Sequence, residues 1–345
     1  MILAIESSCD ESALAIFDPE IGFVDEKIHS QIALHSQYGG VVPDLASREH
    51  LMNFPSLLKH LDINKYQDSI DLIAVTRGPG LAGCLAMGGM LGKSLALNLK
   101  KPLCGVNHLR GHAWSPFIAL HKKDPLIFKE QLHAMLPHLG LIVSGGNTIL
   151  FEINLQKELS IVGETVDDAA GEALDKGGKL MGLAYPAGPK IESLAQSGDA
   201  SGVDFPRSMS KKNDFRFSFS GLKTSLRYKL DKMSDFEIGE SMPTMCASYQ
   251  EAVFSQLIIK TRKRLQAVSY RSIGLSGGVA NNRHLVQSMQ SLASSFSLPL
   301  LTANAQHNGD NAGMIAFAAF VDREKTVFES PLCPLKIEPS ISLLD

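Results

Sequence analysis

Short apolar runs joined by polar, glycine-rich turns recur along the chain. The run Ile2–Ile5, a polar turn and the run Ala13–Phe17 follow one another, which predicts a strand, a turn and a strand. The same arrangement returns in Leu139–Val143, a turn of Ser and Gly, and Ile149–Ile153. Its recurrence at about half the chain length predicts an internal repeat, with one copy opening each of two lobes.

A third glycine-rich turn, SGGVANN, follows the apolar run Ser272–Leu275 and precedes a helical stretch that begins at about Arg283. In Tyr249–Ala267, apolar residues recur at helical spacing, and strands that alternate with helices predict an α/β fold. We expect residues 1–135 to form an N-terminal lobe with the first turn. Residues 136–345 are expected to form a C-terminal lobe with the second and third turns and Asp310.

Composition limits the possible partners and the compartment. The chain has 345 residues, 44% of them apolar, and a net charge of -3, so any polyanion must be bound by a local basic patch. Its five scattered cysteines form no CxxC pair and predict neither a disulfide framework nor a structural zinc site. The first residues carry no basic leader, and no apolar run reaches the length of a membrane span, so we expect a cytoplasmic protein without a membrane partner.

The two hairpin turns are candidates for binding the phosphates of one nucleotide between the lobes. Gly145 and Gly146 would let the backbone approach a phosphate closely. Either turn alone is an ordinary hairpin, but the recurrence favours phosphate binding. Asp10 and Glu11 in the first turn could handle a proton or Mg²⁺, or could be solvated carboxylates. In SGGVANN, Asn282 or its neighbour could bind a base or ribose, or could cap the helix.

A pair of histidines, His108 and His112, stands four residues apart, so a helix would project both imidazoles from one face toward one metal ion. Leu109 occupies the position where a zinc protease has its catalytic Glu, so the pattern favours metal binding without that general base. Asp310 precedes an Ala-rich apolar stretch and could be a third ligand or the N-cap of a helix. Two His and one Asp would leave coordination sites open for a substrate.

Two further segments carry charge at suggestive spacing. Glu172, Asp175 and Lys179 would share a helix face, either as exposed ion pairs or beside the nucleotide. The segment Phe205–Lys229 interleaves Phe215, Phe217 and Phe219 with basic residues, which suits a nucleic-acid backbone and unstacked bases, although a solvated face is the ordinary explanation. Against one acidic residue, its seven basic residues are Arg207, Lys211, Lys212, Arg216, Lys223, Arg227 and Lys229.

Several of these motifs together resemble one family, the tRNA N6-adenosine threonylcarbamoyltransferases, once described as glycoproteases. The matching stretches are AIESSCDES, GGVVPDLASREH, TRGPGLAG, NHLRGH, VSGGNT, GETVDDAAGEALDK, YPAGP, FSFSGLKTS, SGGVANNR and GDNAGMIA. The resemblance implies an actin-like ATPase fold, of the class shared by sugar kinases and Hsp70, with two duplicated lobes around a nucleotide cleft. It implies transfer of a threonylcarbamoyl group from threonylcarbamoyl-AMP to N6 of adenosine 37 in tRNAs that read ANN codons.

The resemblance also implies ligands and partners. It places one divalent metal, Fe²⁺ or Zn²⁺, on His108, His112 and Asp310. It implies tRNA as substrate, ATP with Mg²⁺ as a further ligand, and two protein partners, a paralogous actin-like subunit and a small ATPase. Residue by residue, it places substrate contacts on Ile142, Val143, Ser144, Gly145, Gly146, Asp175, Gly188, Asn282 and, where an Asp is usual, Glu192.

This chain departs from the family pattern at four positions besides Glu192. Asn147 stands where the family has His, and Ala187 replaces the first Gly of YPGGP. Gly177 and Gly178 stand where Thr and Ala are usual, and two adjacent glycines could interrupt the helix expected here. The metal and substrate positions, Glu192 apart, keep their usual residues.

Three other functions compete with this interpretation. A metallopeptidase would need a general base beside the histidine pair. A non-catalytic scaffold paralogue would be expected to lose the metal residues, which this chain keeps. A small-molecule kinase of the same fold would need a sugar pocket and no histidines.

Overall fold

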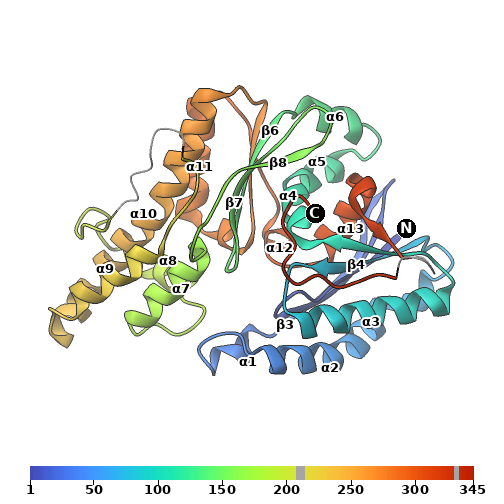
Figure 1. The fold of residues 1–345 in the computed structure, drawn as a ribbon, viewed down its shortest axis with the longest axis horizontal. Coiled ribbons are helices and arrows are strands. Elements are labelled where there is room, and N and C mark those ends of the chain that lie inside the picture. The colour runs from blue at the N-terminus through green and yellow to red at the C-terminus, as the bar shows by residue number, and fades with distance from the viewer. Residues whose placement is uncertain (207–213, 330–333) are drawn as a thin grey trace. The chain divides into compact units, whose positions relative to one another are not determined.

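The computed structural model describes residues 1–206, 214–329 and 334–345. They divide into two compact units, each with its own mixed sheet and its own helices (Figure 1). Unit 1 comprises Met1–His133 and Ala303–Asp345, and unit 2 comprises Ala134–Thr302. Among these described residues, no helix combines the length and apolar character that crossing a membrane requires.

Unit 1 is built on a six-stranded sheet with the order β11-β5-β4-β1-β2-β3. The central strand β1 is buried along its whole length, as its uninterrupted apolar run predicts. β1 pairs antiparallel with β2 and parallel with β4, and β4 pairs parallel with β5. The strands are β1 (Ile2–Glu6), β2 (Glu11–Asp18), β3 (Gly22–Ser30), β4 (Leu72–Gly78), β5 (Leu103–Asn107) and β11 (Val327–Phe328).

Helices cover both faces of this sheet. Leu57 of α2 and Ala96 of α3 share one apolar cluster with Ile5 of β1, so these two helices cover one face. On the other face, Phe317 of α13 packs edge-on against Phe17 of β2, with ring centroids 5.9 Å apart. The helices of unit 1 are α1 (Ile32–Ser36), α2 (Pro43–Leu61), α3 (Ala82–Leu99), α4 (His108–Trp114), α5 (Ile118–Lys123), α6 (Phe128–Ala134), α12 (Ala305–Asn308) and α13 (Ala312–Val321).

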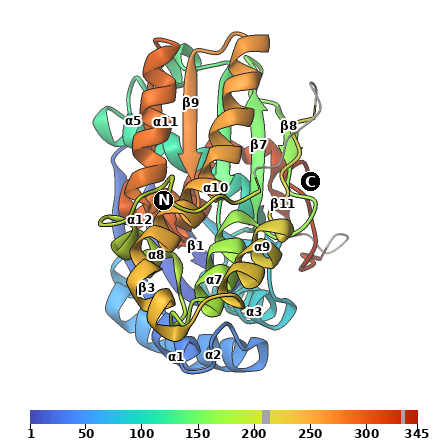
Figure 2. The ribbon, with the colours of Figure 1, turned by 90° about the vertical axis from the view of Figure 1, so that its left-hand side faces the viewer.

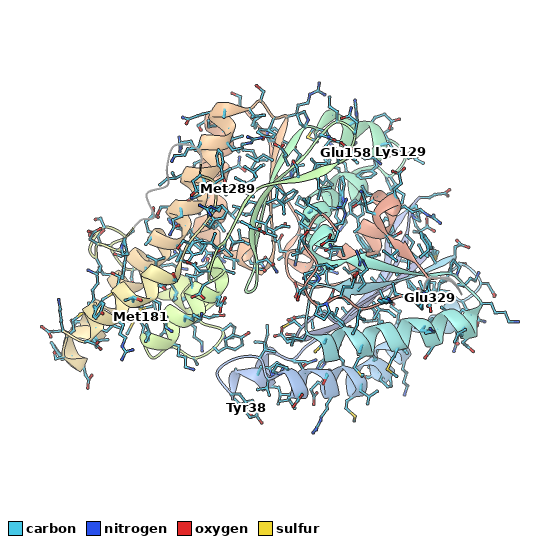
Figure 3. All side chains as sticks on the ribbon, in the orientation of Figure 1. Tyr38, Lys129, Glu158, Met181, Met289 and Glu329 are labelled. Carbon is cyan, nitrogen blue, oxygen red and sulfur yellow. The ribbon has the colours of Figure 1, made fainter. Side chains whose placement is uncertain are left out.

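Unit 2 has a five-stranded sheet with the order β10-β9-β6-β7-β8. Its strands are β6 (His138–Val143), β7 (Thr148–Ile153), β8 (Leu159–Glu164), β9 (Ser272–Ser276) and β10 (Leu300–Thr302). Its helices are α7 (Ala170–Leu180), α8 (Gly188–Ala195), α9 (Ser220–Leu230), α10 (Asp235–Ala267) and α11 (Arg283–Ser295). α7, α10 and α11 bury one face of the sheet in a single core that includes Met181 and Met289 (Figures 2 and 3).

The two sheets share one topology, and the predicted internal repeat is visible in it. In unit 1, β1, β2 and β3 are antiparallel, β4 pairs parallel with β1, and β5 pairs parallel with β4. In unit 2, β6, β7 and β8 are antiparallel, β9 pairs parallel with β6, and β10 pairs parallel with β9. The β1–β2 turn and the β6–β7 turn are therefore equivalent. In each unit, a glycine that follows β4 or β9 lies close to the backbone of this hairpin. A Cβ on Gly80 would lie 2.5 Å from the Ser8 carbonyl oxygen, and a Cβ on Gly277 would lie 2.4 Å from the Val143 carbonyl oxygen.

The expected lobes, 1–135 and 136–345, differ from these units at the C-terminal end. The first division lies close to the expected one, but Ala303–Asp345, which includes Asp310, belongs to unit 1 instead of to the C-terminal lobe. The physical reason is that α13 is apolar and buried over nearly all its length, and it covers the face of the first sheet that α2 and α3 leave open. The short strand β11 then extends that sheet beside β5.

Candidate metal centre and substrate loops

The histidine pair lies on α4, a helix that starts directly after strand β5. Asn107 is the N-cap residue, and its side-chain oxygen accepts a hydrogen bond from the backbone N–H of Leu109 at 2.9 Å. His108 and His112 therefore lie one turn apart on the same face, with ring centroids 4.8 Å apart. Every residue of α4 is buried, so both imidazoles are held in the interior of unit 1.

Asp310 lies at the start of α13, but it does not cap that helix. The N-cap is Asn311, whose side chain accepts the backbone N–H of Met314 at 2.8 Å, so the interpretation of Asp310 as a cap is wrong. Helix α4 packs closely on α13 because Gly111 has no side chain, and a Cβ there would lie 3.1 Å from Met314. This packing brings the carboxylate of Asp310 to the two imidazoles.

The three predicted metal residues converge. One Asp310 carboxylate oxygen lies 3.0 Å from Nε2 of His112 and 3.4 Å from Nε2 of His108. Among the described residues, His108, His112 and Asp310 form a group whose donor atoms all lie within 4.8 Å of one another. Two imidazole nitrogens and one carboxylate suit Zn²⁺ or Fe²⁺, and three protein ligands leave positions open for a substrate.

Glu6, which is not among the site residues predicted from the sequence, completes the surroundings of His108. One oxygen of its buried carboxylate lies 3.1 Å from Nδ1 of His108 and accepts the Thr76 hydroxyl at 2.6 Å. A carboxylate on the far nitrogen of a ligating imidazole fixes the tautomer that leaves Nε2 for the metal. In the sequence, Glu6 is marked only by its position as an acidic residue at the end of an apolar run. That position is too common to identify a site residue.

The electrostatics of the cluster favour a bound cation. Burial raises the pKa of Asp310, but the two facing imidazoles outweigh burial and hold it far below its ordinary range. Burial lowers the pKa of His108, whereas Asp310 and Glu6 raise it, and the resulting pKa lies well above the usual value. Carboxylates on both sides of His108 therefore attract positive charge, and a divalent ion can supply it in place of a proton.

The carboxylates of the first turn also belong to unit 1. Asp10 is buried, so the interpretation as a solvated turn carboxylate is wrong for this residue. Glu11 begins β2, and one of its carboxylate oxygens accepts the Ser30 hydroxyl at 3.1 Å. Burial raises the pKa of Glu11 well above its ordinary value, and the negative charges of Asp10 and Asp310 raise it further.

In unit 2, the turn Ser144–Asn147 closes on itself at the end of β6. The Asn147 N–H binds the Ser144 hydroxyl at 3.0 Å, and the Ser144 N–H binds the Asn147 carbonyl at 2.8 Å. Gly145 and Gly146 are exposed, and no atom lies within 4 Å of where their Cβ would be. Ile142 and Val143 are also predicted substrate contacts, but both side chains are fully buried. These two residues could therefore contact a ligand only through the backbone.

Asp175 tethers the start of α8. Its carboxylate accepts the backbone N–H of Ala187 at 2.7 Å and that of Gly188. Burial raises the pKa of Asp175, although these two hydrogen bonds oppose that shift. The alternative of an exposed ion pair with Lys179 is wrong, since Glu172 pairs with Lys176 instead, at 2.9 Å.

Asn282 of the third turn, and Glu192 near it, form hydrogen bonds with other protein groups. Asn282 caps α11, because its side-chain oxygen accepts the Leu285 N–H at 3.1 Å, while its Nδ2 donates to Gln250 at 2.8 Å. Glu192 accepts the next backbone N–H, that of Arg283, at 2.9 Å. Both side chains fix the loop between β9 and α11.

The departures from the family pattern are accommodated in α7, which runs unbroken through Gly177 and Gly178. A Cβ on Gly178 would lie 2.2 Å from the Cβ of Ala187. The space between α7 and the start of α8 therefore holds one methyl group, and in this chain Ala187 supplies it. A Cβ on Gly177 would collide with the ring of Tyr249.

The basic segment has a mixed outcome. Arg207, Lys211 and Lys212 lie outside the described residues. Phe217 and Phe219 are buried in the core of unit 2, so the prediction that these phenylalanines stack on bases is wrong. The described cations that remain exposed are Arg216, which pairs with Asp214, and Lys223 and Arg227 of α9. Lys229 is half-buried, with its ammonium group over the ring of Phe205.

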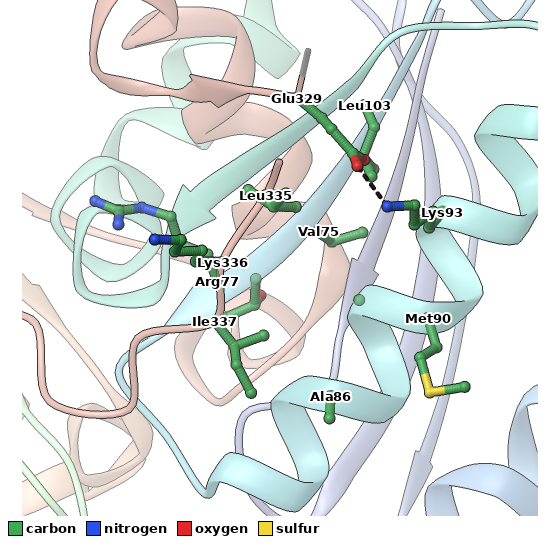
Figure 4. Close-up of a pocket in the computed structure, with 12 residues that line it drawn as sticks. Val75, Arg77, Ala86, Met90, Lys93, Leu103, Glu329, Leu335, Lys336 and Ile337 are labelled. Carbon is green, nitrogen blue, oxygen red and sulfur yellow. Dashed lines mark hydrogen bonds and ion pairs between the residues drawn. The ribbon is translucent and has the colours of Figure 1, made fainter. Parts of the chain in front are cut away.

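A pocket of about 470 Å³ lies elsewhere in unit 1, between β4, β5, α3 and the C-terminal segment (Figure 4). Lys93 and Glu329 form an ion pair at its edge, with Nζ and Oε1 2.7 Å apart. None of the predicted site residues lines it. The lining residues are Val75, Thr76, Arg77, Ala86, Gly89, Met90, Lys93, Leu103, Glu329, Leu335, Lys336 and Ile337.

Comparison with known proteins identifies the family. A family model described as tRNA N6-adenosine threonylcarbamoyltransferase matches residues 22–317. The chain belongs to this family. A Thermosipho africanus protein of the same name is 40% identical over 93% of both chains. A Dichelobacter nodosus protein of that name is 40% identical over 92% of this chain and 90% of its own length. The family resemblance of the motifs is therefore confirmed, over 93% of the chain.

Solved structures agree on the fold. The (R)-2-hydroxyglutaryl-CoA dehydratase component A of Acidaminococcus fermentans matches with a TM-score of 0.51 and 13% identity over 94% of this chain and 99% of its own. T. kodakarensis HypF matches with a TM-score of 0.57 and 13% identity over 92% of this chain and 47% of its own. At this identity the likeness concerns the fold alone, and the predicted actin-like class with two α/β lobes is confirmed.

Proposed function

We propose that this chain transfers the threonylcarbamoyl group of threonylcarbamoyl-AMP to N6 of adenosine 37 in tRNAs that read ANN codons. Family membership over residues 22–317 carries this proposal. The convergence of His108, His112 and Asp310 supports it, because two buried imidazoles and one carboxylate are a ligand set that suits a divalent metal.

We propose a separate role for the site residues of each unit. The three ligands would hold one divalent ion, Fe²⁺ or Zn²⁺, which supplies a Lewis acid for the carboxylate and carbonyl of the threonylcarbamoyl group. Glu6 keeps His108 oriented for that ion. The exposed backbone of Gly145 and Gly146 would bind the adenylate phosphate, and Gly188, held by Asp175, would contact the nucleotide.

The donor is an activated acyl phosphate, so the protein has to orient it and neutralise the charge of the departing AMP. The N6 amine attacks the carbamoyl carbon, the bond from that carbon to the phosphate oxygen breaks, and AMP leaves with the electron pair. The amine must also lose a proton. We propose Asp10, with Glu11 as the second candidate, because Asp10 is a buried carboxylate in the same unit as the metal cluster.

The partners follow from the same family membership. We propose tRNA as the acceptor and exposed cations of α9, such as Lys223, as part of its binding surface. A paralogous actin-like subunit and a small ATPase that uses ATP and Mg²⁺ are proposed as protein partners. Asn282 and Glu192 are proposed to act through the loop that they hold, because both side chains already bind protein groups.

The proposal is tested by mass spectrometry of tRNA nucleosides after incubation with threonylcarbamoyl-AMP, with and without candidate partner subunits. We expect threonylcarbamoyladenosine to appear, and to disappear when His112→Ala replaces the wild type. A clean preparation that modifies no tRNA under any of these conditions would reject the transferase function. Peptide hydrolysis lost in His112→Ala would instead favour a metallopeptidase, which the buried, apolar Leu109 argues against.

A further inference from the structure

The last residues of the chain are tied to the helix that carries the histidine pair. The backbone carbonyl of Ser342 accepts Nδ2 of Asn107 at 2.7 Å, and that of Leu343 accepts the Arg110 guanidinium at 3.1 Å. Asn107 caps α4 next to His108, and Arg110 stands between the two histidines. The segment is thus bound at the first turn of α4.

The same segment is anchored on its other side to β4 and the loop after it. Glu338 donates its backbone N–H to the Arg77 carbonyl at 2.7 Å, and its carboxylate pairs with the Arg77 guanidinium. Gly80 donates its N–H to the Pro339 carbonyl at 3.1 Å. Leu343 has no exposed surface, so the chain end is packed into unit 1.

Arg110 connects the chain end to the helix that follows Asp310. Its guanidinium also binds the carboxylate of Asp322, the C-cap residue of α13, and the same carboxylate accepts the indole N–H of Trp114 at 3.0 Å. The carbonyls of Ser342 and Leu343 and the carboxylate of Asp322 therefore all bind α4 through one row of side chains, those of Asn107, Arg110 and Trp114. None of these groups belongs to the candidate metal cluster.

We propose that Ser342–Leu343 is a positioning element for the metal centre, which acts through Asn107 and Arg110 to set the orientation of His108 and His112. This inference rests on the proposed metal cluster. Groups that orient metal ligands typically change metal affinity by about 10-fold to 100-fold when they are removed. A segment that only stabilised the fold would leave the geometry of the bound ion unchanged.

The test uses the full chain, with Zn²⁺ titrated in competition with a chelator and with the visible spectrum of bound Co²⁺. Asn107→Ser keeps a good N-cap for α4 and introduces no charge, but it loses the donor to Ser342. A chain ending at Ile341 loses both carbonyl contacts. Leu343→Ala is the matched control, since it loses the buried side chain and keeps both carbonyls.

We expect Asn107→Ser and the shortened chain to bind Zn²⁺ about 10-fold more weakly and to give an altered Co²⁺ spectrum, while Leu343→Ala matches the wild type in both. Wild-type affinity and spectrum in Asn107→Ser would overturn the inference, and this variant decides it if the shortened chain does not fold. A loss in Leu343→Ala as large as in the shortened chain would also overturn it. If the wild type and Asp310→Ala bind Zn²⁺ equally, the metal cluster itself is refuted.

Discussion

Gly178 of α7 lies close to Ala187 at the start of α8. We predict that Gly178→Ala destabilises the protein when residue 187 is Ala and stabilises it when residue 187 is Gly. In Gly178→Ala, the new methyl group would lie 2.2 Å from the Ala187 Cβ, a separation that must grow to at least 3.4 Å. The two helices must therefore move apart. Overpacking of this kind costs about 1–3 kcal/mol.

The same substitution also brings a gain, because Ala is favoured over Gly inside a helix by about 0.8–1 kcal/mol. The net expectation for Gly178→Ala alone is a loss of up to about 2 kcal/mol in the free energy of unfolding. In the Ala187→Gly background the clash is absent and only the gain remains. There, Gly178→Ala should stabilise the protein by about 1 kcal/mol.

The assay is a double-mutant cycle in urea, followed by circular dichroism, with m-values compared to check that the transition keeps its character. Gly239→Ala in α10 is the control, because no atom lies within 4 Å of its Cβ position, and it should behave the same in both backgrounds. Adenylate affinity should follow the cycle, since Asp175 binds the N–H groups of Ala187 and Gly188. Equal effects of Gly178→Ala in the two backgrounds would refute the shared-methyl reasoning.

Three further predictions concern unit 2. Asn282→Asp keeps the cap of α11 but loses its Nδ2 donor, and it should weaken adenylate binding; unchanged affinity in a titration would remove the residue from the proposed site. Burial lowers the pKa of His138 to about 3, so the unfolded chain alone binds its proton as the pH falls from about 6.5 toward that value. Stability should fall in this window by up to about 1.4 kcal/mol per pH unit, and urea midpoints of His138→Asn should lack this component. Replacing Lys223 and Arg227 by Gln should reduce the salt slope of tRNA binding by about 0.7–0.9 per lost phosphate contact, and an unaltered slope would place the RNA surface elsewhere.

Local spacing accounts for what the sequence could predict. The two strand-turn-strand segments depend on apolar runs and turn residues within about 15 positions, and the structure has both hairpins where expected. The histidine pair depends on one helical turn, and α4 provides it. Asp310 could be proposed as a ligand from the motif, but its distance to the imidazoles depends on the packing of α4 against α13.

What the sequence could not predict depends on contacts between distant segments. The apolar helix α13 shows no preference in its own pattern for one sheet over the other, so its return to unit 1 could not be foreseen. Phe217 and Phe219 alternate with polar residues as exposed aromatics would, but they fill the core of unit 2. Glu6 gains its role only because the parallel pairing of β1, β4 and β5 brings the N-terminus of α4 to the end of β1.

The central claim is that one divalent ion on His108, His112 and Asp310 is needed for transfer to tRNA. The most direct measurement is the rate of threonylcarbamoyl transfer by chelator-treated protein as metal is returned in known amounts, with bound metal determined in the same samples. Activity is predicted to rise in proportion to bound metal up to one ion per chain, and Asp310→Ala is predicted to recover neither. Full transfer by the metal-free wild type, or equal metal and equal rate in Asp310→Ala, would contradict the account.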